Sequence, residues 1–208
     1  MSDPYIEKIK TRFIQPLPGR TAQVKMAPNI AREFKPANNA RIACVLALLY
    51  PKNANWHIVL IERMSSTNRS DRHSGQISFP GGGYEDSDGL LARAALREAE
   101  EEVGVNSKDI SIIGQLTDMY IPVSNFLVHP FVGFMDYAPS FIPEPSEVKD
   151  ILEVPISKLQ DPATIQTTDL KIPEGFIIRD VPHYSLNGHI VWGATAMMLS
   201  EFIEVIDV

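Results

Sequence analysis

The run 97–105, REAEEEVGV, constrains the fold most, because it places four glutamates within five residues. On a helix, residues three and four positions apart share one face, so Glu98, Glu101 and Glu102 would converge. Three clustered carboxylates repel one another unless a cation lies among them. The other side of the same helix is apolar: Leu96, Ala99 and Val103. The run therefore predicts a helix with one face for a hard metal ion and the other for a core.

Composition narrows the class of protein. A chain of 208 residues is long enough for one domain with a sizeable core. Its net charge of −7 leaves no broad basic surface, so nucleic acid is not expected as a partner. No apolar run approaches the about 20 residues of a membrane span, and residues 1–12 lack the apolar core of a signal peptide. We therefore expect a cytoplasmic protein with one reduced cysteine, Cys44, and no membrane contact.

The chain divides near residue 39. Residues 3–14 have helical spacing of apolar side chains, with Asp3 as a cap and Pro4 in the first turn. Residues 15–39 contain four prolines, each of which removes a backbone donor and disfavours a continuous helix. We predict an N-terminal helix and irregular lead-in over residues 1–39, followed by a domain over residues 40–208.

The rest of the chain alternates between strand and helix patterns. Two aliphatic runs with a polar connection predict a hairpin, and a short strand runs into three glycines. Strands are predicted at 42–50, 57–64, 76–79, 110–121 and 127–135, a proline-rich loop at 138–146, and mixed strand and turn at 176–192. Helices are predicted at about 88–103, 147–152, near 157 and at 194–206. This order indicates an α/β fold with a mixed sheet.

The order of strand, glycine loop and acidic helix points to phosphate chemistry. Glycines let the backbone approach a ligand closely, and the residues that follow them are not those of a P-loop. Mg²⁺ binds through a few carboxylates together with substrate phosphates, and a nearby glutamate can deprotonate a metal-bound water. Arg97 can orient a carboxylate by a bidentate pair. The structural alternative is a solvated acidic helix face, against which the glycine run and the Gly104 helix stop argue.

At these residues the chain resembles the Nudix hydrolases. The second half of their sequence box matches in order at Arg97, Glu98, Ala99, Glu101, Glu102, Gly104 and Val105. In the first half, the box glycine falls on Gly83, but the position of the first glutamate falls on Gly89, with Glu85 and Asp88 as the nearest acids. The resemblance implies an α/β/α sandwich with a mixed sheet.

The resemblance also implies roles for the acidic residues. Glu98 and Glu102 are expected to ligate Mg²⁺ or Mn²⁺, and Glu101 is expected to be a further ligand or the general base. Glu98, Glu101 and Arg97 are the expected catalytic residues. Glu144 or Glu147, in or just after the proline-rich loop, is an alternative source of the base.

A second resemblance concerns the substrate. Arg63 and the run HSGQISFPGG at 73–82 are similar to the sequence upstream of the box in coenzyme A pyrophosphatases. The expected reaction splits the diphosphate of coenzyme A or a derivative into 3′,5′-ADP and 4′-phosphopantetheine. The residues expected to bind the substrate are Arg63, His73, Gly75, Gly81 and Gly82.

Two alternatives stay open beside this interpretation. The same chemistry can act on another nucleoside diphosphate, such as ADP-ribose or a dinucleotide. A non-catalytic nucleotide-binding module on the same fold is the other alternative, which the intact set of glutamates disfavours. The expected partner is a small nucleoside diphosphate, and a homodimer is left open.

Overall fold

The computed structural model describes residues 3–28, 35–65, 75–172 and 175–207. Within them, one sheet contains β1 (Arg41–Lys52), β2 (Asn55–Arg63), β3 (Ile77–Ser78), β4 (Gly81–Gly83), β5 (Ser111–Gln115), β6 (Met119–Ile121), β7 (Phe126–Phe134) and β8 (Val148–Pro155). A second sheet contains β9 (Ile165–Lys171), β10 (Ile177–Leu186) and β11 (His189–Trp192). The helices are α1 (Pro4–Phe13), α2 (Arg20–Gln23), α3 (Leu91–Val103), α4 (Ile156–Leu159) and α5 (Gly193–Ile206), with four 3-10 turns at Val24–Met26, Asp86–Asp88, Ser107–Asp109 and Pro162–Thr164.

The main sheet is mixed and has β1 at its centre. Its strand order is β3-β2-β1-β7-β5, with β4 paired to β1, β6 to β7 and β8 to β2. Strand β1 runs parallel to β7 and antiparallel to β2 and β4. Because β1 is covered on both faces, it reads as a nearly continuous apolar run.

Alternate residues of β1 and β2 supply two separate cores. One core packs against α3 and includes Cys44, Leu46, Leu48, Tyr50, Val59 and Ile61. The other packs against α1, α5 and the second sheet and includes Ala47, Leu49, Ile58 and Leu60. This alternation follows from the two-residue period of a strand, and it fixes the face on which each later side chain of β2 lies.

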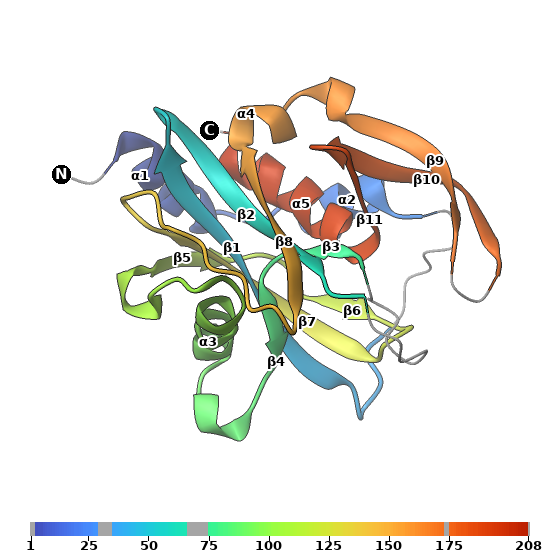
Figure 1. Ribbon diagram of the computed structural model, residues 1–208, viewed down its shortest axis with the longest axis horizontal. Coiled ribbons are helices and arrows are strands. Elements are labelled where there is room, and N and C mark those ends of the chain that lie inside the picture. The colour runs from blue at the N-terminus through green and yellow to red at the C-terminus, as the bar shows by residue number, and fades with distance from the viewer. Residues whose placement is uncertain (1–2, 29–34, 66–74, 173–174, 208) are drawn as a thin grey trace.

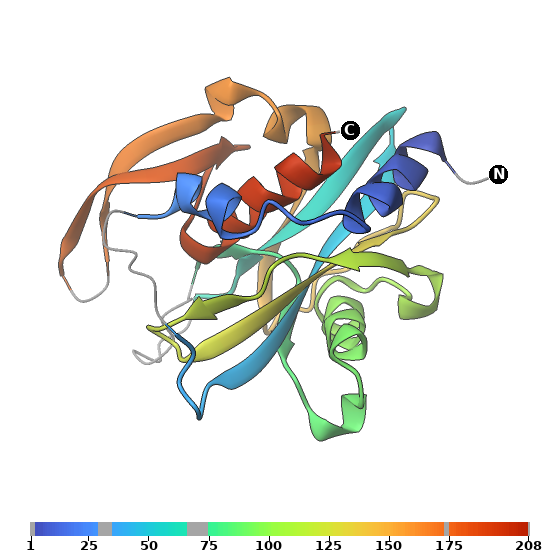
Figure 2. The same cartoon turned by 180° about the vertical axis from the view of Figure 1, so that it is seen from behind.

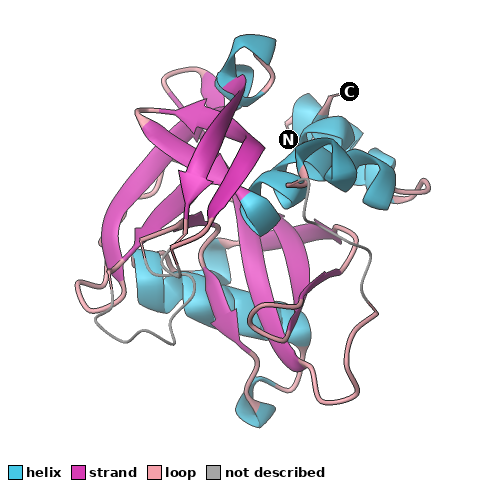
Figure 3. Ribbon diagram, turned by 90° about the vertical axis from the view of Figure 1, so that its right-hand side faces the viewer, coloured by secondary structure: helices cyan, strands magenta, loops and turns pink. Residues whose placement is uncertain are grey.

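The layers confirm the predicted α/β architecture. Figure 1 shows α3 on one face of the main sheet and α5 on the other. Seen from behind in Figure 2, α1, α2 and α5 lie together on the face opposite α3. Figure 3 shows the helices on both sides of the strands. The mixed sheet between helical layers agrees with the expected α/β/α sandwich.

Several predicted elements are confirmed with shifted ends. The N-terminal and C-terminal helices appear as α1 and α5, and the helix near residue 157 is α4. The hairpin is present, but its strands extend to Lys52 and Asn55, because Asn53 and Ala54 adopt positive φ angles that close a tight turn. The lead-in after α1 is not wholly irregular, since α2 and a 3-10 turn lie within it.

Other predicted elements are wrong. The predicted helix at 147–152 is wrong, because residues 148–152 belong to strand β8, which pairs with β2 with one register shift between Glu62 and Arg63. Short apolar segments cannot be assigned by periodicity alone, and here the pairing with β2 decides. The predicted helix over 88–103 begins at Leu91, because Asp88 ends a 3-10 turn and Gly89 has φ of +69°. The predicted strand over 110–121 is interrupted and forms β5 and β6.

Among the described helices, none is both long enough and apolar enough to cross a membrane.

Candidate functional site

The three glycines before the acidic helix form a strand, not the predicted loop. Gly81–Gly83 pairs antiparallel with Ala43–Val45 of β1. A Cβ atom on Gly81 would overlap the Cys44 carbonyl oxygen, and a Cβ on Gly82 would overlap the carboxylate of Glu98. Glycine is therefore required here by close approach, on one side to the sheet backbone and on the other to a glutamate. The glycine strand and the acidic helix are therefore in direct contact.

Glu102 is buried beneath this strand, with 2% of its side chain exposed. Its Oε2 accepts a hydrogen bond of 2.7 Å from the Gly81 N–H, and its Oε1 lies 3.4 Å from Nη1 of Arg63. Burial raises the pKa of Glu102 to about 7, although the Gly81 N–H and Arg63 act in the opposite direction. The negative charges of Glu98 and Glu147 raise this pKa further.

Glu98 lies one helical turn before Glu102 and has 13% of its side chain exposed. Its carboxylate packs against Gly82, and its Oε1 accepts a 2.9 Å hydrogen bond from Nη1 of Arg97. Burial is the main cause of its raised pKa, while Arg97 opposes the shift. Glu102 is buried and Glu98 is partly buried, so ionising both carboxylates without a cation is costly.

Glu101 completes the predicted set but lies at the rim. Its side chain is 58% exposed, and its Oε2 accepts a 3.2 Å hydrogen bond from Nη1 of Arg97. The helix thus presents one buried, one partly buried and one exposed carboxylate. The predicted convergence of all three is wrong, because among the described residues they do not form a group whose ligand atoms lie within 4.8 Å of one another. The low exposure of Glu98 and Glu102 suits cation binding, whereas the carboxylate of Glu101 is open to water.

Arg97 connects the helix to the turn before it. Its Nε and Nη2 donate to Oδ1 and Oδ2 of Asp88 at 2.8 and 3.1 Å, so Arg97 forms a bidentate pair with Asp88 and not with a glutamate of the helix. Its Nη2 also donates to the Gly83 carbonyl oxygen at 3.0 Å. Together with the bonds to Glu98 and Glu101, this arrangement uses all five N–H donors of the guanidinium.

Sequence reasoning did not assign Asp88 to this site. Counting along the box put the first acid at Gly89, which has no side chain, and named Asp88 only as a nearby acid. Asp88 has 4% of its side chain exposed, and the hydrogen bond from Arg97 is the main cause of its lowered pKa. A capping box with Glu85 was the available signal, because it marks a short turn that fixes Asp88.

The residues predicted to bind substrate are brought together only in part. Arg63, at the end of β2, reaches Glu102, and Gly81 and Gly82 form the strand against which Glu102 and Glu98 lie. Gly75 has φ of +69° and leads into β3, whose entry is held by the Arg63 N–H bonded to the Gln76 carbonyl at 3.0 Å. His73 lies outside the described residues.

The proline-rich loop predicted at 138–146 closes the C-terminal end of α3. The N–H groups of Ile142 and Glu144 bond the carbonyl oxygens of Val103 and Glu102 at 2.9 and 3.0 Å. The carboxylate of Glu144 is turned to Ser146 within the loop. Of the two alternative bases, Glu147 interacts electrostatically with the glutamates of α3, because its negative charge raises the pKa of both Glu98 and Glu102.

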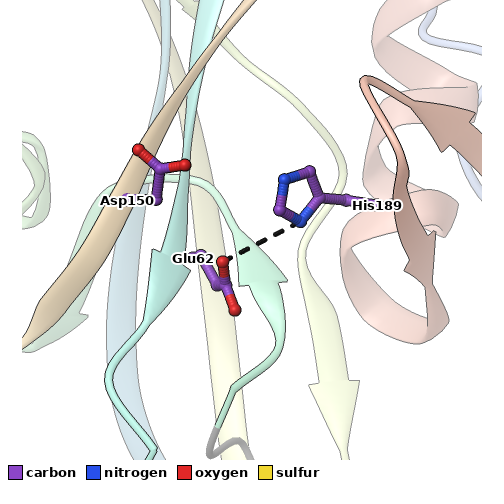
Figure 4. Close-up of side chains that lie close together, drawn as sticks. All are labelled: Glu62, Asp150 and His189. Carbon is purple, nitrogen blue, oxygen red and sulfur yellow. Dashed lines mark ion pairs between the residues drawn. The ribbon is translucent and has the colours of Figure 1, made fainter.

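A second group of possible metal ligands lies on the opposite face of the sheet. Glu62, Asp150 and His189 come from β2, β8 and β11, and their ligand atoms lie within 4.8 Å of one another (Figure 4). The Nζ of Lys149 lies 2.6 Å from Glu62, whereas His189 is 3.9 Å from it. Lys149 pairs with one of the two carboxylates of this group, and the other, Asp150, is exposed to solvent, which lowers the cost of both charges in the absence of a metal ion.

His129 is buried in β7, and its Nδ1 lies 2.9 Å from Oδ1 of Asp118.

Comparison with known proteins gives one consistent result. The NUDIX domain family matches residues 40–172. A Nudix hydrolase named NudL from Photorhabdus laumondii subsp. laumondii is 32% identical over 171 residues, covering 82% of this chain and 87% of the relative. A protein of the same name from Yersinia enterocolitica is 30% identical over 145 residues, covering 68% and 73%. Among solved structures, the MutT protein from Methanosarcina mazei Go1 aligns with a TM-score of 0.48 at 15% identity, covering 79% of this chain and 92% of that protein.

Proposed function

The chain belongs to the Nudix hydrolases, and from this premise we propose that it hydrolyses the diphosphate of a nucleoside diphosphate derivative, with coenzyme A or one of its derivatives as the substrate. The products are then 3′,5′-ADP and 4′-phosphopantetheine. The observation that carries the proposal is the position of two glutamates against the glycine strand: the buried Glu102 accepts the Gly81 N–H, and the partly buried Glu98 packs against Gly82.

The donor set fits a hard divalent cation. Glu98 and Glu102 offer carboxylate oxygens, the ligands that Mg²⁺ and Mn²⁺ prefer. Both carboxylates have a raised pKa, because they are buried and carry like charges. A cation between them would remove this cost, so Glu98 and Glu102 are the proposed ligands and Glu101 is a further one at the rim.

The proposed mechanism divides the work among the chain's own residues. A Mg²⁺ or Mn²⁺ ion held by Glu98 and Glu102 would neutralise negative charge on the diphosphate and would lower the pKa of a bound water. Glu101 is exposed and lies on the same helical face, so it is placed to accept the proton of the attacking water. Arg97 holds the carboxylates of Glu98 and Glu101 in position. Arg63 provides a planar guanidinium for a substrate phosphate at the edge of the site.

The choice of coenzyme A rests on sequence resemblance in the segment 73–82 and on Arg63. Of these residues, Arg63, Gly81 and Gly82 surround Glu102 and Glu98. The proposal therefore assigns the substrate's diphosphate to the surface beside the Arg63 guanidinium and the helical face that carries Glu98 and Glu101.

Product analysis tests the proposal. Coenzyme A, ADP-ribose and a dinucleoside polyphosphate are each incubated with the protein and Mg²⁺, and the products are separated by chromatography. We expect 3′,5′-ADP and 4′-phosphopantetheine from coenzyme A, and at least 100-fold slower turnover in Glu98→Gln.

Glu100→Gln is the matched control, because Glu100 lies on the same helix but is exposed and contacts Ser107 instead of the buried pair. Its turnover is expected to stay within twofold of the wild type. Cleavage of ADP-ribose but not coenzyme A would move the substrate to another nucleoside diphosphate, and no cleavage of any diphosphate would overturn the proposal.

A further inference from the structure

The group of Glu62, Asp150 and His189, here called the intersheet group, lies where the two sheets meet. Its ligand atoms lie within 4.8 Å of one another, and they come from β2 and β8 of the main sheet and from β11 of the second sheet (Figure 4). Glu62 continues the alternation of Ile58 and Leu60, which pack in the core opposite α3. The intersheet group is therefore separate from the site on α3.

The register of the main sheet sets the two carboxylates of this group against each other. Glu62 pairs directly with Asp150, next to the apolar pair of Ile61 and Ile151. Like charges in directly opposed positions of antiparallel strands weaken the pairing of the strands. Water relieves this repulsion only in part, because 13% of the Glu62 side chain is exposed. A cation bound by both carboxylates would replace the repulsion with an attraction.

The hairpin between β10 and β11 fixes the third donor. Leu186 pairs with His189 across Asn187 and Gly188, whose positive φ angles close a tight two-residue turn. The Nδ1 of His189 lies 3.9 Å from Oε2 of Glu62, which is too long for a hydrogen bond. It is close to the separation of about 3.4 Å between two ligands of one tetrahedral ion with bonds of about 2.1 Å.

Lys149 occupies only part of the group. Its Nζ lies 2.6 Å from Oε1 of Glu62, whereas Oε2 is the oxygen that faces His189. The Oδ1 of Asp150 accepts the Ile151 N–H at 2.8 Å. Within the described part of the chain, this leaves one oxygen of each carboxylate and the imidazole as donors for an ion.

We propose that the intersheet group binds one divalent transition-metal ion of the Zn²⁺ type, which joins β11 to the main sheet. An imidazole combined with carboxylates suits Zn²⁺, whereas Mg²⁺ prefers oxygen ligands alone. Three protein ligands leave the fourth position of a tetrahedral ion to water. The inference goes beyond the proposed function, because neither the hydrolysis nor the glutamates of α3 depend on this ion.

The test measures Zn²⁺ binding by equilibrium dialysis of the metal-free protein. The double variant Glu98→Gln, Glu102→Gln serves as the background, because it removes the proposed site on α3. We expect one Zn²⁺ per chain in this background, and at least about 10-fold weaker binding when His189→Ala or Asp150→Asn is added.

The matched control is Glu153→Gln, which removes a charge from the same strand as Asp150. Glu153 contacts Tyr50 and Lys52 instead of the intersheet group. Its substitution should change Zn²⁺ binding less than about threefold, since distant sites contribute independently. An equal loss in Glu153→Gln and Asp150→Asn would overturn the inference.

Lys149→Ala gives a change in the opposite direction, which a misfolded variant would not show. Removing the ammonium frees Oε1 of Glu62 and takes away a positive charge, so Zn²⁺ should bind about fivefold more tightly. Binding that is unchanged or weaker in Lys149→Ala would contradict the assignment of Glu62 as a ligand.

A wild-type crystal soaked in Zn²⁺ gives the position of the ion. We expect an anomalous peak between β2, β8 and β11, and its absence there would overturn the inference. Turnover of coenzyme A by His189→Ala with Mg²⁺ should stay within about threefold of the wild type. Wild-type protein that binds Zn²⁺ at the intersheet group but hydrolyses no diphosphate would refute the proposed function alone, and hydrolysis without this Zn²⁺ binding would refute the inference alone.

Discussion

At the residue scale, the buried carboxylates of the site oppose folding as long as no cation is bound. The residue Glu102 as a whole is 1% exposed, and burial raises its pKa in the folded protein to about 7 from an ordinary value of 4.5. Because the folded-state pKa is raised, ionisation of Glu102 lowers the stability of the metal-free protein as pH rises from about 4.5 to about 7. Above that range the full cost is present.

Glu102→Gln should therefore stabilise the metal-free protein at high pH. The amide can still accept the Gly81 N–H but carries no charge. We expect a gain of up to about 3 kcal/mol at pH 8 and little gain at pH 5, measured by urea unfolding in EDTA. The exposed Glu100→Gln should show no such pH dependence, and a gain that is equal at both pH values would contradict the assigned pKa.

Cys44 offers an independent check of the same core. It is fully buried on β1, where it pairs with Gly82 of β4. Burial raises the pKa of its thiol to about 12, and the negative charges of Asp88 and Glu98 act in the same direction. Since the thiolate is the reactive form, folded protein at pH 8 should not react with a thiol reagent over the time in which the urea-unfolded chain reacts fully. Complete labelling of the folded protein at the rate of a free thiol would contradict the placement.

At the element scale, Glu201 of α5 joins the N-terminal segment to the sheet. It is fully buried and accepts hydrogen bonds from the Gly19 N–H, Gln23 Nε2, and the N–H and hydroxyl of Thr117. If the carboxylate of Glu201 were removed, these donors would lose their acceptor on α5. Each buried donor left without an acceptor costs about 1–3 kcal/mol of folding stability.

Glu201→Ala is therefore expected to lower the free energy of unfolding by about 3 kcal/mol or more in urea denaturation. Glu204→Ala, on the same helix, breaks only a surface pair with Lys25 and should cost less than about 1 kcal/mol. Similar losses in the two variants would show that the buried network is not a main tie between these elements.

Elements with strong local signals could be predicted from the sequence. Helix α3 has an apolar stripe and a left-handed Gly104 stop, and the hairpin has two long apolar runs. Strand β8 was mistaken for a helix because its pairing with β2 is not visible locally. Strand β9 was missed, because most of its residues are exposed and its sequence lacks an apolar alternation.

In the site too, the features set by local sequence could be predicted, and those set by the packing of distant elements could not. Convergence of Glu98 and Glu102 follows from helical spacing alone, and the contact with Gly81 and Gly82 follows from their nearness in sequence. The difference in burial between Glu102 and Glu101 depends on β4, which was predicted to be a loop. The role of Asp88 depends on a 3-10 turn that displaces the acid by one position from that expected.

At the scale of the whole molecule, the N-terminal helix is part of the core. Ile6 and Ile9 of α1 are fully buried in the cluster that contains α5, and the ring of Tyr5 lies 5.9 Å from that of Trp56 in β2. Although the sequence predicts a boundary near residue 39, this packing leads us to expect one cooperative unfolding unit.

Ile9→Ala should lower the stability of that unit as a whole. We expect a loss of about 2–5 kcal/mol, with circular dichroism and tryptophan fluorescence reporting one coincident transition at a lower urea concentration. Ile14→Ala is the matched control, because Ile14 is 86% exposed just after the same helix. Two separate transitions, or an unchanged midpoint in Ile9→Ala, would contradict the expected coupling.

The central claim is that the buried Glu102 and the partly buried Glu98 hold a divalent cation beside Gly81 and Gly82. Anomalous scattering from a crystal of the protein soaked in Mn²⁺ tests it most directly. We predict a peak within coordination distance of both carboxylates, absent in Glu98→Gln. A crystal in which Mn²⁺ appears only at Glu62, Asp150 and His189, or at neither cluster, would contradict the account.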